Sequence, residues 1–227
     1  MKAEYVQYGC GWSSAPSKWR NFDASPTLRF ERLPVIGRLY TKNELRFPSN
    51  VEYGDIVKGL SVAKDSCKGI YCSHVLEHLS LVDFRAALRN TFQILRSDGI
   101  FRFVLPDLEY LVKNYIENQK NNAALEFMRE SFLGHESRAR GAKGLVTTWL
   151  GNSQHLWMWD YKSIKPELEH AGFIEIRRAF FGDSLDSFFA AVEDKGRWEN
   201  CLGVECRKPG SKDTATDGIS NALHCRR

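Results

Sequence analysis

A short buried strand between two amphipathic helices constrains the fold of this chain most. Apolar residues recur at helical spacing from Asp83 to Leu95, and Ser97-Asp98-Gly99 interrupts the pattern. The run from Ile100 to Leu105, apolar except at Arg102, is typical of a strand that is buried on both faces, and Pro106-Asp107 ends it. Helical periodicity returns from Leu108 to Ile116. Helices that alternate with buried strands in this way predict a parallel α/β sheet.

Further elements extend this pattern in both directions. Short strands that end at turn residues are expected at Val6–Tyr8, Arg20–Asp23, Val51–Tyr53, Lys68–Cys72, Ile174–Phe180 and Cys201–Arg207. A helix is expected from Asn122 to Phe132. Another helix, capped by Ser163 and ended by Gly172, would hold Pro166 in its first turn. Residues 27–50 are expected to be irregular.

The length of the chain bounds its domain organisation. With 227 residues and 43% hydrophobic content, it is long enough for one well-covered core and too short for two ordinary enzyme domains. We therefore expect one domain over residues 1–208. Residues 209–227 are polar and aperiodic, which predicts a disordered tail.

Composition disfavours several classes of partner. Lys and Arg number 32 against 28 Asp and Glu, and the surplus is spread along the chain, so nucleic-acid binding is not expected. The apolar runs are far shorter than the roughly twenty residues of a membrane span, and the N-terminus has no signal-peptide pattern. The six cysteines form no CxxC pair. These features predict a cytoplasmic protein with reduced thiols, and they leave its oligomeric state open.

Ligand-binding residue types follow the predicted strands at their carboxyl ends. They are Gly9-Cys10-Gly11, Asp23, Asp55, Ser73-His74 and Pro106-Asp107. In an open parallel sheet these ends meet at one edge, where ligands bind.

An adenosine-containing cofactor suits this set. Glycines let a ligand approach the backbone closely, although Gly-x-Gly alone is more often a simple turn. The carboxylate of Asp23 can accept both hydroxyls of a ribose. The carboxylate of Asp55 suits the exocyclic amine of adenine, with the N–H of Ile56 facing a ring nitrogen.

The spacing disfavours a dinucleotide. A dinucleotide fingerprint needs G-x-G-x-x-G and an acidic residue about twenty positions on, whereas here Asp23 follows Gly11 by twelve positions and the third glycine is missing. The stretch from Trp12 to Asn21 contains Pro16 and little periodicity, so no full helix is expected to receive a pyrophosphate. A cofactor without phosphates fits better than NAD.

Several motifs resemble those of small bacterial class I S-adenosylmethionine-dependent methyltransferases of the type 11 kind, over residues 6 to 208. They are Gly9-Cys10-Gly11, Trp19-x-Asn21-x-Asp23, the stretch from Tyr71 to Leu79, Leu95-x-x-x-Gly99 and the stretch from Val104 to Glu109. The resemblance implies a Rossmann-like seven-stranded sheet with the strand Cys201–Arg207 antiparallel. This sequence departs from the wider class at Gln7-Tyr8, where an acidic residue is usual, and in its shortened first crossover helix.

The resemblance also implies the ligands. The glycine loop and Asp23 would hold the methionine moiety and ribose of S-adenosylmethionine, Asp55-Ile56 the adenine, and Ser73-His74 would close the pocket. The acceptor would be a small molecule or saccharide, methylated on oxygen or nitrogen.

The aromatic segment Asn152–Asp160 contains the first candidate for a catalytic residue. We expect this segment to line the acceptor pocket, with His155 as general base and Asp107 as the second candidate. Glycines at 134, 141, 144 and 151 predict a mobile lid over residues 134–153. Its Arg138, Arg140 and Lys143 would favour an anionic acceptor, unless they belong to a solvated basic loop.

Other interpretations of the same residues remain. His74-x-x-Glu77-His78 matches an inverted zinc-peptidase motif, but it starts at a strand end rather than on a long helix, so no metal is expected. Cys10 has no recognisable His partner, which disfavours a nucleophilic role. A non-catalytic module that binds S-adenosylmethionine is the main alternative to an enzyme, and an NAD-dependent reductase is a third.

Overall fold

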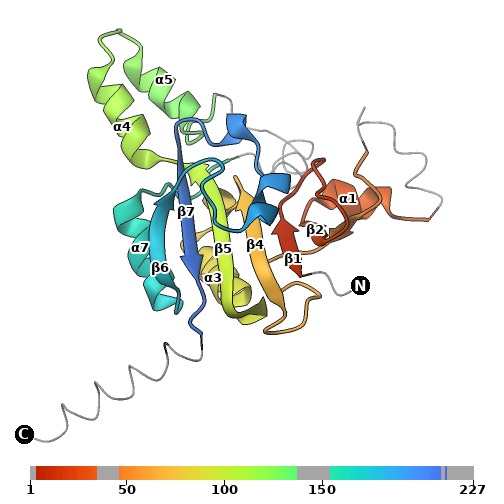
Figure 1. Cartoon of the computed structure of the whole chain (residues 1–227). Helices are drawn as coiled ribbons and strands as arrows, with labels where there is room; N and C mark the ends of the chain where they lie inside the picture. The colour runs from red at the N-terminus through yellow and green to blue at the C-terminus, as the bar shows by residue number, and fades with distance from the viewer. Residues whose placement is uncertain (1–3, 35–45, 137–153, 211–212, 214–227) are drawn as a thin grey trace, which may run out of the picture.

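A seven-stranded sheet forms the centre of the computed structural model (Figure 1), which describes residues 4–34, 46–136, 154–210 and 213. The strands follow the order β3-β2-β1-β4-β5-β7-β6. Their bounds are β1 Tyr5–Tyr8, β2 Trp19–Asp23, β3 Val51–Tyr53, β4 Cys67–Ser73, β5 Leu95–Pro106, β6 Ile174–Ala179 and β7 Cys201–Arg207. All seven strands expected from the sequence are present.

Strand direction confirms the Rossmann-like arrangement. β3, β2, β1, β4 and β5 pair in parallel, and β7 is antiparallel to both β5 and β6. The chain first builds β1, β2 and β3 outward in one direction, and then places β4 on the other side of β1. The strand order therefore reverses between β1 and β4, and the carboxyl ends of these two strands frame the expected ligand position.

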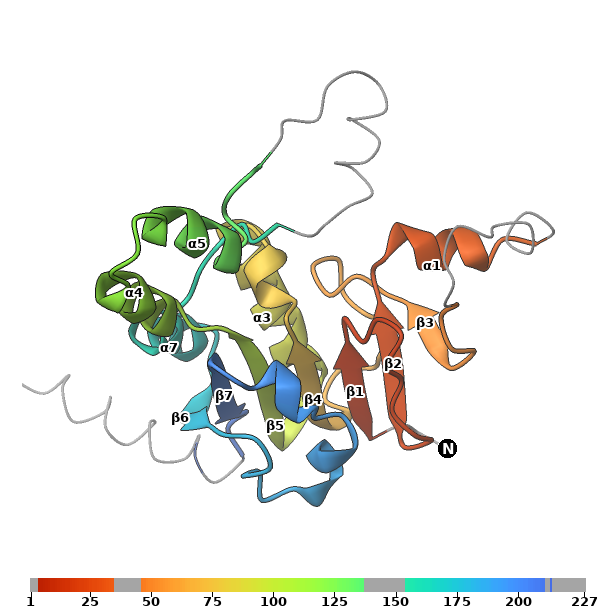
Figure 2. The ribbon, with the colours of Figure 1, turned by 90° about the horizontal axis from the view of Figure 1, so that it is seen from above.

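Helices cover one face of the sheet, as Figure 2 shows for α3 and α7. The helices and short 3₁₀ turns are α1 Pro26–Glu31, η1 Leu76–His78, α3 Leu81–Ile94, α4 Leu108–Glu117, α5 Ala123–Glu130, α7 Tyr161–His170, η2 Ser187–Ala191 and η3 Lys195–Arg197. Buried Phe84 and Leu88 of α3 and Ile164 of α7 share one core cluster with Val6 and Phe101 of the sheet. The α4–α5 pair instead projects beyond the carboxyl ends of the strands (Figure 1).

The other face is covered by the connection between β6 and β7 (Figure 2). Phe189 of η2 and Trp198, next to η3, join Tyr5 and Tyr71 of the sheet in a second core cluster. Within the part of the chain that the structure describes, no helix joins β1 to β2, as the sequence predicts. The β6–β7 connection therefore supplies the apolar cover that a first crossover helix would otherwise give.

Three expectations are wrong in detail. The cap of α7 is Asp160, which accepts from the backbone N–H of Ser163 while Ser163 Oγ reaches back to the Asp160 backbone, so Ser163 is the second half of a capping box. Pro166 consequently lies inside the helix rather than in its first turn. Residues 27–50 are not wholly irregular, because Ser25 caps α1 and Pro26 begins it.

Most of the predicted lid, including Arg138, Arg140 and Lys143, lies outside the described residues, as does nearly all of the predicted tail. Among the helices that are described, none is long and apolar enough to cross a bilayer.

Candidate cofactor and acceptor site

The glycine loop after β1 is held by a close approach to the end of β4. Gly9 and Gly11 have φ of +66° and +56°, a region that disfavours residues with a Cβ. A Cβ on Gly9 would also overlap the side chain of Val75. Gly9 therefore lets the loops after β1 and β4 pack directly against each other at the reversal of strand order.

Asp23, at the end of β2, organises two neighbouring turns. Its Oδ2 accepts a hydrogen bond of 2.9 Å from the backbone N–H of Gly11, and its Oδ1 accepts one of 2.8 Å from the N–H of Ser25. Each carboxylate oxygen can accept a further bond. Asp23 thus lies beside the glycine loop with acceptor capacity to spare.

Cys10 is a structural residue of this loop. Burial, together with the charge of Asp23, raises the pKa of its thiol to about 12. Since the thiolate is the reactive form, this environment agrees with the expectation that Cys10 is not a nucleophile.

Asp55 forms the turn that follows β3. Its Oδ1 accepts from the N–H of Val57 at 3.0 Å, and its Oδ2 lies 3.3 Å from Lys58 Nζ. Ile56 is buried, and its carbonyl accepts a 2.7 Å bond from Asn90 Nδ2. The turn is therefore fixed from two sides, next to the end of β2.

Arg197 forms two hydrogen bonds with Ser73 at the end of β4, a contact that was not predicted from the sequence. Its Nε donates to Ser73 Oγ at 2.7 Å, and its Nη2 donates to the Ser73 carbonyl at 2.9 Å. His74, with φ of +53°, donates from Nε2 to the Arg197 carbonyl at 2.9 Å. Burial lowers the pKa of His74, but contacts with Cys201 and Glu77 outweigh this effect and raise it to about 10. Arg197 and Glu77 thus hold Ser73 and His74 in place at the end of β4.

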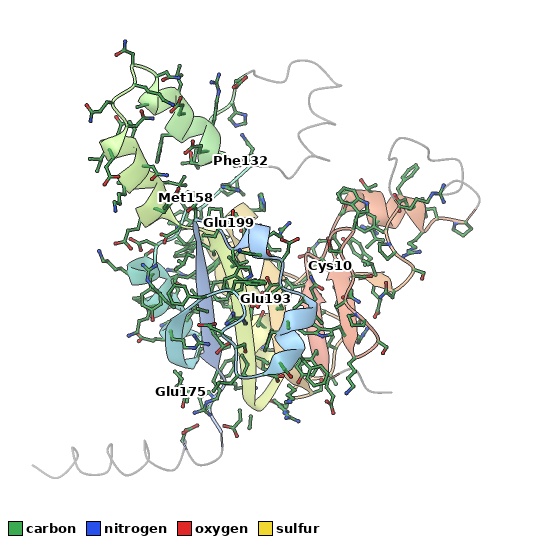
Figure 3. The ribbon with its side chains drawn as sticks, turned by 45° about the horizontal axis from the view of Figure 1, so that its top comes forward. Cys10, Phe132, Met158, Glu175, Glu193 and Glu199 are labelled. Carbon is green, nitrogen blue, oxygen red and sulfur yellow. The ribbon has the colours of Figure 1, made fainter. Side chains whose placement is uncertain are left out.

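A cavity of about 740 Å³ opens beyond the carboxyl ends of β4 and β5. Its lining includes His74, Asp107, Phe132, His155 and Arg197. Figure 3 shows Phe132 at this end of the sheet, beside α5. The volume is in the range of about 300–1,000 Å³ that is usual for small-molecule sites.

Asp107 already has structural contacts within this cavity wall. Its Oδ1 caps α4 by accepting from the N–H of Glu109 at 2.9 Å, and its Oδ2 lies 3.4 Å from an Arg178 nitrogen. The residue is 8% exposed. Asp107 thus has structural roles of its own, as the cap of α4 and as the partner of Arg178.

His155 lies against the buried carboxylate of Glu77. Its Nε2 is 4.0 Å from Glu77 Oε1, and its ring centroid is 5.0 Å from that of His78. Burial lowers the pKa of His155, although Glu77 acts in the opposite direction. The backbone carbonyl of Glu77 accepts from the N–H groups of Leu156 and Trp157, which ties η1 to the segment that carries His155.

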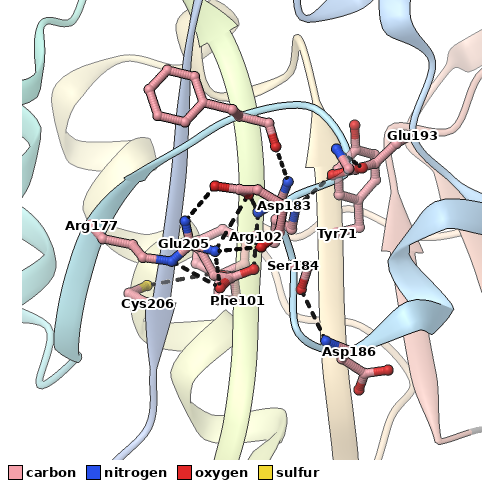
Figure 4. Close-up of polar contacts among 12 residues, drawn as sticks. Tyr71, Phe101, Arg102, Arg177, Asp183, Ser184, Asp186, Glu193, Glu205 and Cys206 are labelled. Carbon is pink, nitrogen blue, oxygen red and sulfur yellow. Dashed lines mark hydrogen bonds and ion pairs between the residues drawn. The ribbon is translucent and has the colours of Figure 1, made fainter.

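A buried ion network supports η3, the 3₁₀ turn that ends at Arg197 (Figure 4). Arg102 of β5 has no exposed surface, and its guanidinium contacts three carboxylates and stacks on the ring of Trp198, 4.6 Å from the centroid. The carboxylates are those of Asp183, Glu193 and Glu205. Glu193 and Trp198 flank η3 on either side, so this network fixes the position from which Arg197 reaches Ser73.

Comparison with solved structures finds similar folds. An S-adenosylmethionine-dependent methyltransferase from Archaeoglobus fulgidus is 13% identical, with 90% of this chain and 85% of that chain covered and a TM-score of 0.46. One from Thermotoga maritima, described as a possible histamine N-methyltransferase, is 16% identical, with coverage of 90% and 82% and a TM-score of 0.47. One from Mesorhizobium loti is 16% identical, with coverage of 90% of both chains and a TM-score of 0.45.

Sequence comparison gives the family. No curated protein matches the chain. The model of a methyltransferase domain family matches residues 15–175, which is more than half of the chain. The matched range holds β2 to β5 and most of the residues that follow these strands. The chain therefore belongs to this methyltransferase domain family, and it is an S-adenosylmethionine-dependent methyltransferase.

Proposed function

We propose that this enzyme transfers the methyl group of S-adenosylmethionine to an oxygen or nitrogen atom of a small-molecule or saccharide-type acceptor. The observation that carries the proposal is the 740 Å³ cavity, which opens beside the reversal of strand order and shares His74 with the expected cofactor wall. An acceptor in this cavity would lie next to a cofactor bound over the ends of β1 and β4.

The proposed cofactor residues are those that follow the parallel strands. Gly9, Cys10 and Gly11 would leave room for the methionine moiety, and Asp23 would accept the ribose hydroxyls. The turn at Asp55 and Ile56 would hold the adenine, and Ser73 and His74 would close the pocket toward the acceptor. The proximity of the glycine loop to Asp23, and of Gly54 N–H to the Asp23 carbonyl at 3.1 Å, supports one continuous site.

The chemistry needs alignment and a proton acceptor. Methyl transfer from a sulfonium is an in-line displacement, so the enzyme gains most by orienting donor and acceptor away from water. His155 is 8% exposed and lines the cavity, and we assign it the role of proton acceptor, with Asp107 as the second candidate.

The charges of the cavity bear on the type of acceptor. His74 and Arg197 line it, and Arg178 lies beside Asp107. Glu77, Asp107 and Glu130 line the same cavity and offset these cations. We propose that Arg138, Arg140 and Lys143 supply the preference for an acceptor with a carboxylate, phosphate or anionic sugar group. A cytoplasmic location is also proposed. It is supported by the free thiols among the described residues, at Cys10, Cys67, Cys72, Cys201 and Cys206.

The test has two stages. Calorimetry first measures binding of S-adenosylhomocysteine, and acceptors are then screened with labelled S-adenosylmethionine. In the His155→Asn variant, kcat should fall by about 10²–10⁴-fold, the usual contribution of a general base, with cofactor affinity unchanged. Full activity in this variant would remove His155 from the mechanism. Cofactor binding without transfer to any acceptor would favour the non-catalytic alternative.

A further inference from the structure

The carboxylate of Glu77 is buried with only His74 as a close ionic partner among the described residues. Glu77 has no exposed surface, and neither of its oxygens receives a hydrogen bond from the described residues. Its nearest charged neighbour is His74, whose Nδ1 lies 3.2 Å from Oε1. A buried carboxylate that lacks hydrogen bonds is costly, unless something else occupies the space in front of it.

Two imidazoles meet at this carboxylate. Glu77, His78 and His155 each place one potential ligand atom within 4.8 Å of the others. His78 Nδ1 donates to the Gln154 carbonyl at 2.8 Å, so Nε2 is the ring nitrogen that could hold a ligand. His155 Nδ1 is buried and has no hydrogen-bond partner among the described residues. His155 Nε2 lies 4.0 Å from Glu77 Oε1, and in the tautomer that carries its proton on Nδ1 this nitrogen has a lone pair available beside the carboxylate.

We propose that Glu77, His78 and His155 bind a divalent transition-metal cation, such as Zn²⁺, Mn²⁺ or Fe²⁺. Two imidazole nitrogens and one carboxylate oxygen form a ligand set that such cations prefer, whereas Mg²⁺ and Ca²⁺ favour oxygen ligands. Ligand atoms about 2.1 Å from a cation lie at most about 4.2 Å apart. A small inward movement of the side chains would reach this geometry.

The surroundings of the three residues suit a metal site. The Nδ1–H of His78 is held by a backbone carbonyl and the carboxylate of Glu77 by His74, the arrangement by which metal ligands are usually oriented. The bonds from Leu156 and Trp157 to the Glu77 carbonyl hold the two ligand-bearing segments together. The ring of Phe132, 5.0 Å from that of His155, supplies an apolar side.

A three-residue site leaves coordination positions open, and all three ligands line the 740 Å³ cavity. A bound cation would face whatever molecule enters there. If the cavity is the acceptor site, an inference that rests on the proposed function, the cation selects acceptors with a hydroxyl or carboxylate oxygen to coordinate. A bound cation would also withdraw His155 from proton transfer, and it lowers the pKa of a coordinated hydroxyl in its place.

The experiment measures metal binding without turnover. Full-length protein is stripped with a chelator and titrated with Zn²⁺ by calorimetry, and with Co²⁺ by visible absorption, which reports the ligands. We expect one equivalent to bind. The variants Glu77→Gln and His155→Asn should each bind at least about tenfold more weakly, since loss of outer partners alone costs about 10- to 100-fold. His170→Asn, at the end of α7, is the matched control and should bind like the wild type.

Two outcomes overturn the proposal. One is a wild-type protein that binds none of Zn²⁺, Mn²⁺ and Co²⁺ while it still binds S-adenosylhomocysteine, which would leave only the Glu77–His74 ion pair. The other is unchanged affinity in both ligand variants, which would place the cation elsewhere. Titration of every variant with S-adenosylhomocysteine separates these outcomes from misfolding and from failure of the proposed function, because the cofactor residues are different ones.

Discussion

The backbone N–H of Gly11 donates a 2.9 Å hydrogen bond to Asp23 Oδ2, which joins the loop after β1 to the end of the neighbouring strand β2. The same carboxylate accepts from Ser25, at the start of α1. The short connection between β1 and β2 therefore does not leave the glycine loop loose, because a side chain replaces the contacts of a helix. This geometry also positions the carboxylate for the proposed ribose contact.

Replacing Asp23 should weaken cofactor binding. Hydrogen bonds to a charged group contribute about 1.5–3 kcal/mol, so Asp23→Ala should raise the Kd for S-adenosylhomocysteine by about 10- to 100-fold. Calorimetry measures the change, and far-UV circular dichroism verifies the fold. Asp65→Asn is the control, since Asp65 precedes β4 at the opposite edge of the sheet. Wild-type affinity in Asp23→Ala would remove Asp23 from the site.

A methyl group added at Gly9 should lower the free energy of unfolding more than one added at Gly11. Both glycines have positive φ, which costs another residue about 1–2 kcal/mol, but only Gly9 faces Val75. Urea unfolding should therefore show a larger loss of stability for Gly9→Ala than for Gly11→Ala. Adding Val75→Ala should recover part of the Gly9→Ala loss through the removed overlap. Equal losses in the two glycine variants would contradict the close approach of the loops.

The periodic parts of this chain could be predicted from its sequence, because strands and helices bury local patterns of apolar residues. The apolar run after Gly99 gave β5, and the spacing from Asp83 gave α3. The strand ends then placed Asp23 beside the glycine loop, since parallel strands bring their carboxyl ends to one edge.

Contacts between distant segments could not be predicted in this way. Arg102 interrupts an apolar run, and nothing local says that carboxylates from the β6–β7 connection will meet it. Arg197 and Ser73 meet for the same reason, through a connection without strong periodicity. The pairing of Glu77 with His155 likewise depends on the tertiary fold. The prediction of the α7 cap was wrong for a different reason. Asp160 and Ser163 are both residue types that cap helices well, and the structure uses both in one capping box.

The Cys10 thiol should resist alkylation in the folded protein. Burial and the nearby Asp23 charge raise its pKa to about 12, so the thiolate is scarce near pH 8 and its fraction keeps rising with pH up to that value. Iodoacetamide labelling, followed by peptide mass spectrometry, should be slow in native protein and should accelerate as pH rises. In urea the pKa returns to about 8.5, and labelling should be fast. Equal rates in the two states would show that the glycine loop is open.

Removal of Arg102 should destabilise the whole sheet. Arg102→Ala leaves the buried Glu193 without its cation and leaves Asp183 and Glu205 with Arg177 alone, and breaking a buried ion network costs about 3–5 kcal/mol. Arg85→Ala breaks an exposed pair with Glu167 and should reduce the free energy of unfolding far less, which makes it the matched control. Urea unfolding measures the stability of both variants.

The network also positions η3, so Arg102→Ala should lower the affinity for S-adenosylhomocysteine as well. This affinity is measured at urea concentrations below the unfolding midpoint, where the variant is still folded. A variant as stable as Arg85→Ala would mean that the carboxylates of the β6–β7 connection reach solvent, and that Arg197 is held without them.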